Sequence, residues 1–151
     1  MFKKLAASIF MGVILFAGTA NAEDKKAYVL SMMEKAISHF ESVGQDQAFK
    51  DFDTNGDFRS GEFYVVGQSV ESGNILYHGA NKKLEGKNLS KVKDTDGKLF
   101  VKDMVDLAAT EGKGWVDYKW PHPETKKITP KHSYVQRVEG SDTFLMIGYY
   151  E

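Results

Sequence analysis

Cysteine is absent from all 151 residues, and this absence excludes several kinds of site at once. The chain cannot contain disulfide bonds, thiolate metal ligands, cysteine nucleophiles or a lipid-anchor cysteine, so its stability must come from packing. Arginine is nearly absent too, since only Arg59 and Arg137 occur, and the formal net charge is -1. Such a balanced charge does not indicate binding to nucleic acid or to an anionic membrane surface.

Long apolar runs are also missing, except at the N-terminus. Residues 1–22 begin with Lys3 and Lys4, continue with an apolar stretch and end in the small residues Ala20-Asn21-Ala22. This layout is typical of a cleaved secretory signal peptide. We therefore expect cleavage after Ala22, a periplasmic location, and one domain over residues 23–151 that contains no membrane segment.

The motifs of common hydrolases are not present. A G-x-S-x-G nucleophile elbow fails at its last position, because Gly67-Gln-Ser69-Val is followed by Glu71. No H-E-x-x-H or comparable metal-ligand spacing occurs either. The sequence thus predicts a protein that is not an enzyme and has no cofactor.

Apolar periodicity predicts two helices. Residues 24–43 carry apolar side chains at helical spacing, and one or two further turns follow over residues 45–52. The members of this first stripe are Val29, Met33, Ala36, Ile37 and Phe40. A second helical pattern starts at Leu99 and ends at Gly112, a residue type that favours helix C-termini. Between them, residues 80–98 are polar and rich in turn signals.

Five segments read as strands. A hairpin is expected over residues 62–69 and 74–79, and three consecutive strands over residues 115–120, 131–139 and 143–150. The last of these is apolar on both faces, which predicts a central position with cover above and below. Strands separated by helices in this way predict an α+β domain with a five-stranded antiparallel sheet.

One loop matches the calcium pattern D-x-[DN]-x-[DN]-G-x5-E. Its ligands would be Asp51, Asp53, Asn55, Asp57 and Glu62. However, Glu62 leads into strand-type residues rather than the second helix of an EF-hand, and Arg59 would place a cation near the metal. We favour a plain Asn-Gly turn that leads into a strand, with calcium binding as the alternative function.

The order of the expected elements and several short sequence motifs make this chain resemble the single Cache domain family. These motifs are Gly79-Ala-Asn-Lys-Lys-Leu-Glu-Gly-Lys-Asn-Leu89, Asp94-Thr-Asp-Gly-Lys98, Phe100-Val-Lys-Asp-Met104, Gly114-Trp-Val-Asp-Tyr-Lys-Trp120 and Pro130-Lys-His-Ser-Tyr-Val135. The resemblance implies a PAS-like sensor fold with a long N-terminal helix on one sheet face. It also implies a ligand pocket on the other face, closed by the loop and the second helix.

The same resemblance implies a function. Family members bind small organic ligands, with short carboxylates prominent, and belong to membrane-bound chemoreceptors or sensor kinases. This sequence stops directly after its last strand, so we expect a free-standing sensor or accessory module that has no transmembrane or output domain of its own. Its expected partners are a short carboxylate and a membrane-bound receptor or sensor kinase, and the long first helix could pair in a homodimer.

A small carboxylate in an apolar pocket needs a cation or converging hydrogen-bond donors, and aromatic walls that exclude water. Lys131 is the expected cation, with Arg59 and Arg137 as alternatives. The full set of expected ligand contacts is Tyr77, His78, Trp115, Tyr118, Trp120, Lys131 and Tyr134. Strand alternation places Trp115 on the face opposite Tyr118 and Trp120, so these residues cannot all reach one pocket.

Overall fold

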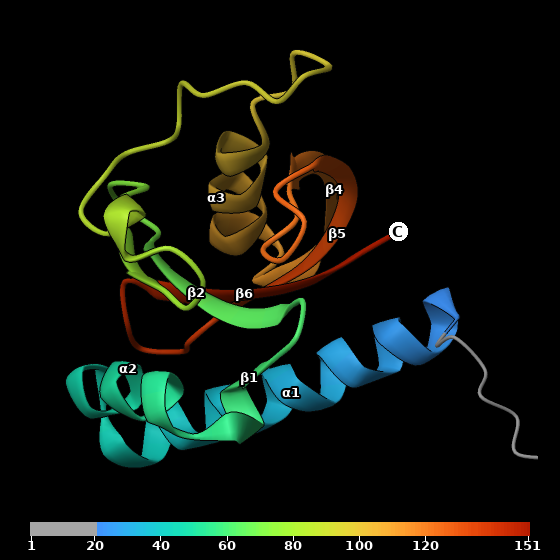
Figure 1. The fold of residues 1–151 in the computed structure, drawn as a ribbon. Helices are drawn as coiled ribbons and strands as arrows, with labels where there is room; N and C mark the ends of the chain where they lie inside the picture. The colour runs from blue at the N-terminus through green and yellow to red at the C-terminus, as the bar shows by residue number, and fades with distance from the viewer. Residues whose placement is uncertain (1–20) are drawn as a thin grey trace, which may run out of the picture.

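The computed structural model describes residues 21–151 and forms one α+β unit (Figure 1). The predicted signal peptide lies outside the described residues, apart from Asn21 and Ala22. The helices and strands are α1 (Ala22–Val43), α2 (Gln45–Thr54), η1 (Gly56–Phe58), β1 (Arg59–Ser60), β2 (Phe63–Ser69), β3 (Ile75–His78), η2 (Lys82–Leu84), α3 (Phe100–Thr110), β4 (Lys113–Pro121), β5 (Ile128–Arg137) and β6 (Thr143–Tyr150). None of the helices in the described part of the chain combines the length and apolarity that crossing a membrane requires.

The strands form one antiparallel sheet in the order β1-β2-β6-β5-β4, with β3 paired to β2. The α+β class and the five predicted strands are confirmed. The sheet contains one strand more than predicted, because the two residues of β1 pair with the start of β2. Such a short segment offers no alternation that could reveal it in the sequence.

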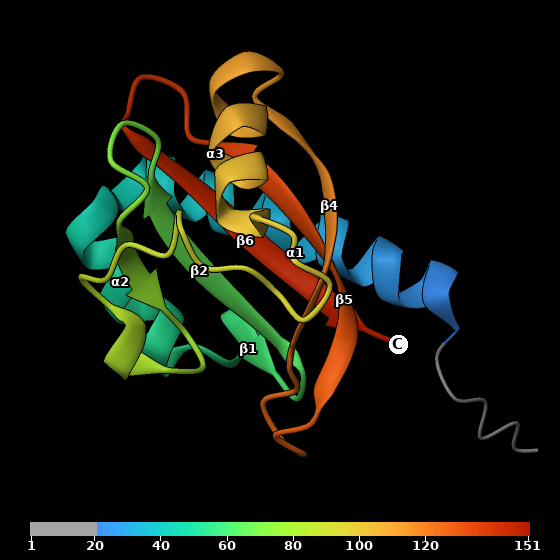
Figure 2. The same cartoon turned by 90° about the horizontal axis from the view of Figure 1, so that it is seen from above.

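The last strand, β6, is the centre of the sheet, as its sequence predicts. It lies between β2 and β5, and all eight of its residues are buried. Helices α1 and α2 cover one face of the sheet, while α3 covers the other (Figures 1 and 2). The fold therefore has two apolar cores, one on each side of β6.

The first helix, α1, is held against the sheet by the predicted stripe. The side chain of Asn21 caps its N-terminus by accepting a hydrogen bond from the Asp24 backbone N–H over 2.9 Å. The buried residues of the helix are Val29, Met32, Met33, Ala36, Ile37 and Phe40. Gly44, with a φ of 82°, ends the helix and starts α2.

Strand β5 differs from its predicted bounds, since it spans residues 128–137 rather than 131–139. Pro130 lies inside it, although a proline was expected to precede the strand. The pairing of β5 with β6 begins only at Lys131, and the Pro130 carbonyl accepts from Glu151 just beyond the ladder. The N–H that proline lacks therefore falls where no ladder bond is required.

Candidate functional site

A small enclosed cavity lies between α3 and the sheet, on the face opposite α1. Its volume is about 20 Å³, roughly the space of one water molecule. The lining residues come from all five long strands, the loop and α3: Val66, Gln68, Ile75, His78, Leu84, Leu89, Phe100, Val101, Met104, Tyr118, Trp120, Lys131 and Met146. This cavity is smaller than the ligand pocket that the family resemblance implies, because side chains of the loop and of α3 fill much of the space on this face.

Four of the seven expected ligand contacts line the cavity: His78, Tyr118, Trp120 and Lys131. The other three, Tyr77, Trp115 and Tyr134, belong to the opposite core under α1 and α2. The two arginines are both exposed. The structure thus separates the expected set by sheet face, as strand alternation requires.

Lys131 is the charged residue of the cavity, and it is enclosed on every side. Only 1% of its surface is exposed to solvent. Its Nζ donates a hydrogen bond to the Tyr64 hydroxyl over 2.8 Å. The same nitrogen lies 4.4, 5.1 and 5.8 Å from the ring centroids of Tyr64, Tyr150 and Tyr118. Three aromatic rings therefore attract the ammonium form through their electron-rich faces.

Within residues 21–151, no carboxylate forms an ion pair with Lys131. Glu62, whose charge acts on Lys131 without contact, lies 2.8 Å from the Nζ of Lys25 and 3.3 Å from Nε2 of His122. Burial lowers the pKa of the Lys131 amine to about 7, and the negative charge of Glu62 offsets only part of this effect. At neutral pH the residue is therefore divided between a buried ammonium and a buried neutral amine.

His78 borders the cavity as a neutral ring. It is 4% exposed, and its Nδ1 accepts the backbone N–H groups of Ala80 and Asn81 over 3.2 and 3.0 Å. The ring proton is consequently on Nε2. Burial, followed by the charges of Lys131 and Lys82, lowers the pKa of this imidazole to about 3. His78 can therefore donate one hydrogen bond but brings no positive charge to the site at neutral pH.

Lowering the pH from 7 to 5 should destabilise the domain by about 2 kcal/mol through His78. The unfolded chain protonates this ring at its ordinary pKa of 6.5, while the folded ring stays neutral down to about 3. The stabilisation is thus complete above pH 6.5 and is lost as the pH falls toward 3. In His78→Asn, an amide oxygen can replace Nδ1 as acceptor without titrating, so urea unfolding at both pH values should show a smaller acid loss. An equal loss in both proteins would contradict this assignment.

Sequence reasoning missed Tyr64 and Tyr150, which contact Lys131. The Tyr64 and Tyr150 hydroxyls lie 3.0 Å apart, and the Tyr150 hydroxyl donates to the Pro121 carbonyl over 3.1 Å. A signal was available for Tyr150, because alternation places it on the same face of β6 as Met146. Tyr64 had no comparable signal, since only the pairing of β2 with β6 brings it near.

A family model described as "Single Cache domain 2" matches residues 17–151. The chain belongs to this family. The resemblance given by the sequence motifs is therefore confirmed.

Solved structures share the fold of this Cache domain. A periplasmic sensor domain of a chemotaxis protein aligns with a TM-score of 0.71 at 24% identity, covering 85% of this chain and 96% of that one. A methyl-accepting chemotaxis protein from Vibrio parahaemolyticus RIMD 2210633 aligns with a TM-score of 0.74 at 19% identity, covering 85% and 89%. A third structure, described as the structural basis for carboxylic acid recognition by a Cache chemosensory domain, has a TM-score of 0.67 and 28% identity, covering 85% and 91%.

A curated relative is the methyl-accepting chemotaxis protein McpP of Pseudomonas putida. It is 39% identical to this Cache domain over 62 residues, which are 41% of this chain and 11% of that receptor. The chain thus spans about a tenth of the relative's length. These relatives thus include a periplasmic sensor domain of a chemotaxis protein and a full-length methyl-accepting chemotaxis protein.

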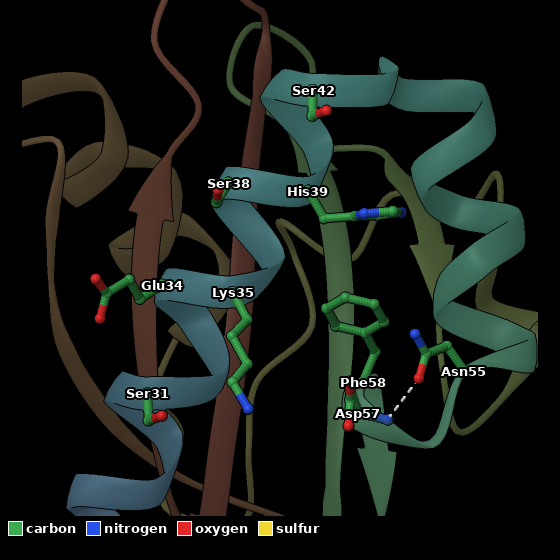
Figure 3. Close-up of a pocket in the computed structure, with 9 residues that line it drawn as sticks. All are labelled: Ser31, Glu34, Lys35, Ser38, His39, Ser42, Asn55, Asp57 and Phe58. Carbon is green, nitrogen blue, oxygen red and sulfur yellow. Dashed lines mark hydrogen bonds between the residues drawn. The ribbon is translucent and has the colours of Figure 1, made fainter.

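A larger hollow of the Cache domain lies elsewhere, along the exposed side of α1 (Figure 3). It measures about 690 Å³ and runs between α1 and the turn that contains Asn55, Asp57 and Phe58. This groove is wide open to solvent, so a small ligand there would remain largely hydrated. Small-molecule sites usually bury most of their ligand, and we therefore place the candidate site at the enclosed cavity.

The calcium-type loop does not converge on one point. Asp51 is the first residue of this loop and lies 2.7 Å from Nε2 of His39, and Asp53 accepts from the Tyr77 hydroxyl over 2.9 Å. The Asn55 side chain accepts from the Asp57 backbone N–H over 3.0 Å (Figure 3). Over residues 21–151, no three His, Asp or Glu side chains are grouped so that they could hold a metal ion. The Asn-Gly turn into a strand, favoured by the sequence, is what the structure contains.

Proposed function

We propose that this Cache domain senses a short-chain carboxylate, which binds in the enclosed cavity with the Lys131 ammonium as its counter-ion. One observation carries the proposal: a buried lysine lines an apolar cavity and forms no ion pair within the described chain. An unpaired buried cation is unfavourable, and a carboxylate would neutralise it at a site that excludes water. The proposed ligand contacts are His78, Tyr118, Trp120 and Lys131, joined by Tyr64 and Tyr150.

The relatives support this choice of ligand. One solved structure with 28% identity concerns carboxylic acid recognition by a Cache chemosensory domain, and it covers 85% of this chain. The charge of the cavity supports it independently, because no acidic side chain from residues 21–151 lines it. A cationic ligand would therefore have no carboxylate in the described part of the cavity to pair with.

A carboxylate needs more room than one water molecule, and the lining can provide it. Met104 and Met146 project into the cavity, and methionine side chains change rotamer at low cost. A neighbouring hollow of about 130 Å³ shares His78, Leu84 and Trp120 with the cavity. We propose that these three residues form the wall through which the ligand enters.

Thermal unfolding with a panel of C2 to C4 carboxylates tests the proposed function. A ligand that binds only the folded state should stabilise it by RT ln(1 + [L]/Kd), about 2.7 kcal/mol at a hundredfold excess over Kd, and the melting temperature should rise accordingly. Matched alcohols and amines of the same size serve as controls. The proposal is wrong if no carboxylate raises the melting temperature beyond that seen with the alcohols.

Tyr77→Phe should leave the carboxylate response unchanged while costing about 1 kcal/mol of stability. The Tyr77 hydroxyl donates to Asp53, and its ring stacks on Phe49 at 5.0 Å, both on the α1 side of the sheet. Burial raises the pKa of this phenol well above its ordinary value, so it remains a neutral donor. Urea unfolding and the carboxylate titration measure the two effects separately. A weakened titration would assign Tyr77 to ligand binding after all.

The remaining parts of the proposal concern location and partners. We propose that the domain works in the periplasm and reports to a membrane-bound chemoreceptor or sensor kinase. Its relatives are sensor domains of such receptors, which supports this assignment. A homodimer through the exposed side of α1 remains part of the proposal, and sedimentation of the purified domain would test it.

A further inference from the structure

Lys131 has a second chemistry that ion pairing with a carboxylate does not use. An enclosed apolar cavity holds the nitrogen at its wall, and a single phenol binds it. Desolvated lysines of this kind act as nucleophiles toward carbonyl compounds, because their neutral form persists at neutral pH. The geometry around Nζ decides whether its lone pair is available.

The hydrogen bonds around Lys131 run in one direction. The Pro121 carbonyl can only accept, so the Tyr150 hydroxyl donates to it over 3.1 Å. The Tyr150 oxygen then accepts from Tyr64 over 3.0 Å, and the Tyr64 oxygen accepts from Nζ over 2.8 Å. This arrangement satisfies three hydrogen bonds, whereas a reversed Tyr64 would satisfy only two. The neutral amine therefore keeps its lone pair directed away from Tyr64.

We propose that Lys131 captures a small 2-oxo acid or aldehyde as a reversible imine in this cavity. The inference rests on the proposed ligand site, and it adds the carbonyl group to the chemical class of the ligand. In the first step the Nζ lone pair forms a bond to the carbonyl carbon while the carbonyl π pair moves to oxygen. A proton passes from nitrogen to that oxygen, and a neutral carbinolamine results.

The second step completes the imine. The remaining proton on nitrogen leaves with the hydroxyl group as one water molecule, and the nitrogen lone pair forms the C=N bond. No oxidant or reductant is consumed, and hydrolysis by one water reverses the sequence. The aromatic and aliphatic walls of the cavity, among them Phe100 and Tyr118, limit the access of that water. An imine would therefore persist longer here than on an exposed lysine.

The groups that face Lys131 favour reaction of the neutral amine. They are Tyr64 on β2, His78 on β3, Tyr118 on β4 and Tyr150 on β6, with Glu62 acting from a greater distance. The part of α3 that lines the cavity contributes only Phe100, Val101 and Met104. Burial raises the pKa of all three tyrosines, so they stay protonated while the amine titrates near pH 7.

Glyoxylate with sodium cyanoborohydride tests the inference on the purified chain. The reductant converts an imine into a stable secondary amine, which intact mass and peptide mapping locate. We expect Lys131 to be labelled at least tenfold faster than the exposed Lys102, and Lys131→Met to lose this fast phase while Lys102→Met keeps it. Tyr64→Phe should slow the labelling without moving it to another residue. Labelling of Lys131 at or below the rate of Lys102 would overturn the inference.

Glycolate separates this inference from the proposed function, because it has the carboxylate of glyoxylate without a reactive carbonyl. If glycolate raises the melting temperature but glyoxylate forms no adduct at Lys131, the imine is wrong and the carboxylate site stands. If neither occurs, both are wrong. Imine formation and carboxylate binding should also depend on pH in opposite directions, because one uses the neutral amine and the other the ammonium. From pH 6 to pH 8 labelling should accelerate, while glycolate binding should weaken. Labelling that slows over this range would count against the amine as nucleophile.

Discussion

Lys131→Met is expected to raise the stability of this Cache domain at pH 7 and to abolish its response to carboxylates. The wild-type fold keeps an amine whose pKa falls from 10.5 to about 7, and this difference costs on the order of 4 kcal/mol at neutral pH. Methionine fills a similar volume without charge, but it loses the hydrogen bond to Tyr64. A net gain of roughly 2 to 4 kcal/mol remains, measurable as a higher midpoint in urea.

The pH dependence identifies the cause of this gain. A base whose folded pKa is lowered contributes stability that is complete above its unfolded pKa and is lost as the pH falls toward the folded value. Between pH 9 and pH 7 the wild type should therefore lose about 2.3 kcal/mol in total relative to Lys131→Met. Lys102→Met is the matched control, because Lys102 is exposed and pairs with Asp106 on the surface of α3. Equal pH profiles for the wild type and Lys131→Met would show that Lys131 is not a buried base.

The contrast between stability and binding has a functional meaning. A residue retained for packing would lower stability when it is replaced, whereas Lys131 should do the opposite. The fold tolerates an unfavourable cation at the point where the proposed ligand would neutralise it. Part of the binding free energy would then come from pairing this buried cation with the ligand. Occupancy of the cavity should therefore increase the stability of the folded domain.

The elements of the fold could be predicted from sequence because each has a strong local pattern. The stripe from Val29 to Phe40 gives α1, and the doubly apolar run from Thr143 to Tyr150 gives the central strand. The start of β5 was misplaced because Pro130 is a local stop signal, while the pairing with β6 that makes it harmless is a tertiary property. Strand β1 was missed because two residues are too few to show the alternation of apolar and polar side chains that indicates a strand.

The candidate site could be predicted only in part, for a similar reason. Lys131 was expected from its position between Pro130 and a Ser-Tyr pair. Strand alternation showed that Trp115 and Tyr118 lie on opposite faces of the sheet. Which face holds the cavity depends on where α3 and the loop pack, and no local pattern specifies that. The hydroxyl of Tyr64 reaches Lys131 from a strand 67 residues away in the chain, so only the fold reveals the contact.

Gly148 explains how such a long side chain fits beside the central strand. Gly148 on β6 lies directly opposite Ser133 on β5. A Cβ placed on Gly148 would lie 2.5 Å from the Ser133 Oγ, 2.7 Å from the Lys131 Cε and 2.9 Å from the His132 carbonyl oxygen. The missing side chain therefore provides the space through which Lys131 crosses β6 toward Tyr64.

Gly148→Ala should destabilise the domain by about 3 kcal/mol, because overpacking at a buried strand forces neighbours to move. Side chains can yield at Ser133 and Lys131, but the His132 carbonyl belongs to the backbone of β5 and can move only by widening the sheet. We also expect the carboxylate response to be lost below the melting temperature, since the displaced Nζ would leave Tyr64. Urea unfolding and carboxylate titration at low temperature measure these two effects.

A second variant separates crowding at this point from a general intolerance of β6 to substitution. Gly148→Ala combined with Ser133→Ala removes the closest clash, so its cost should be smaller than the sum of the two single changes. Gly56→Ala is the matched control, because a Cβ there meets no atom within 4 Å, and it should change stability by less than about 1 kcal/mol. If the double variant is as unstable as the sum, contact with Ser133 is not the cause. The clashes with the Lys131 Cε and the His132 carbonyl would then have to account for the whole effect, and the carboxylate response should stay absent in the double variant as well.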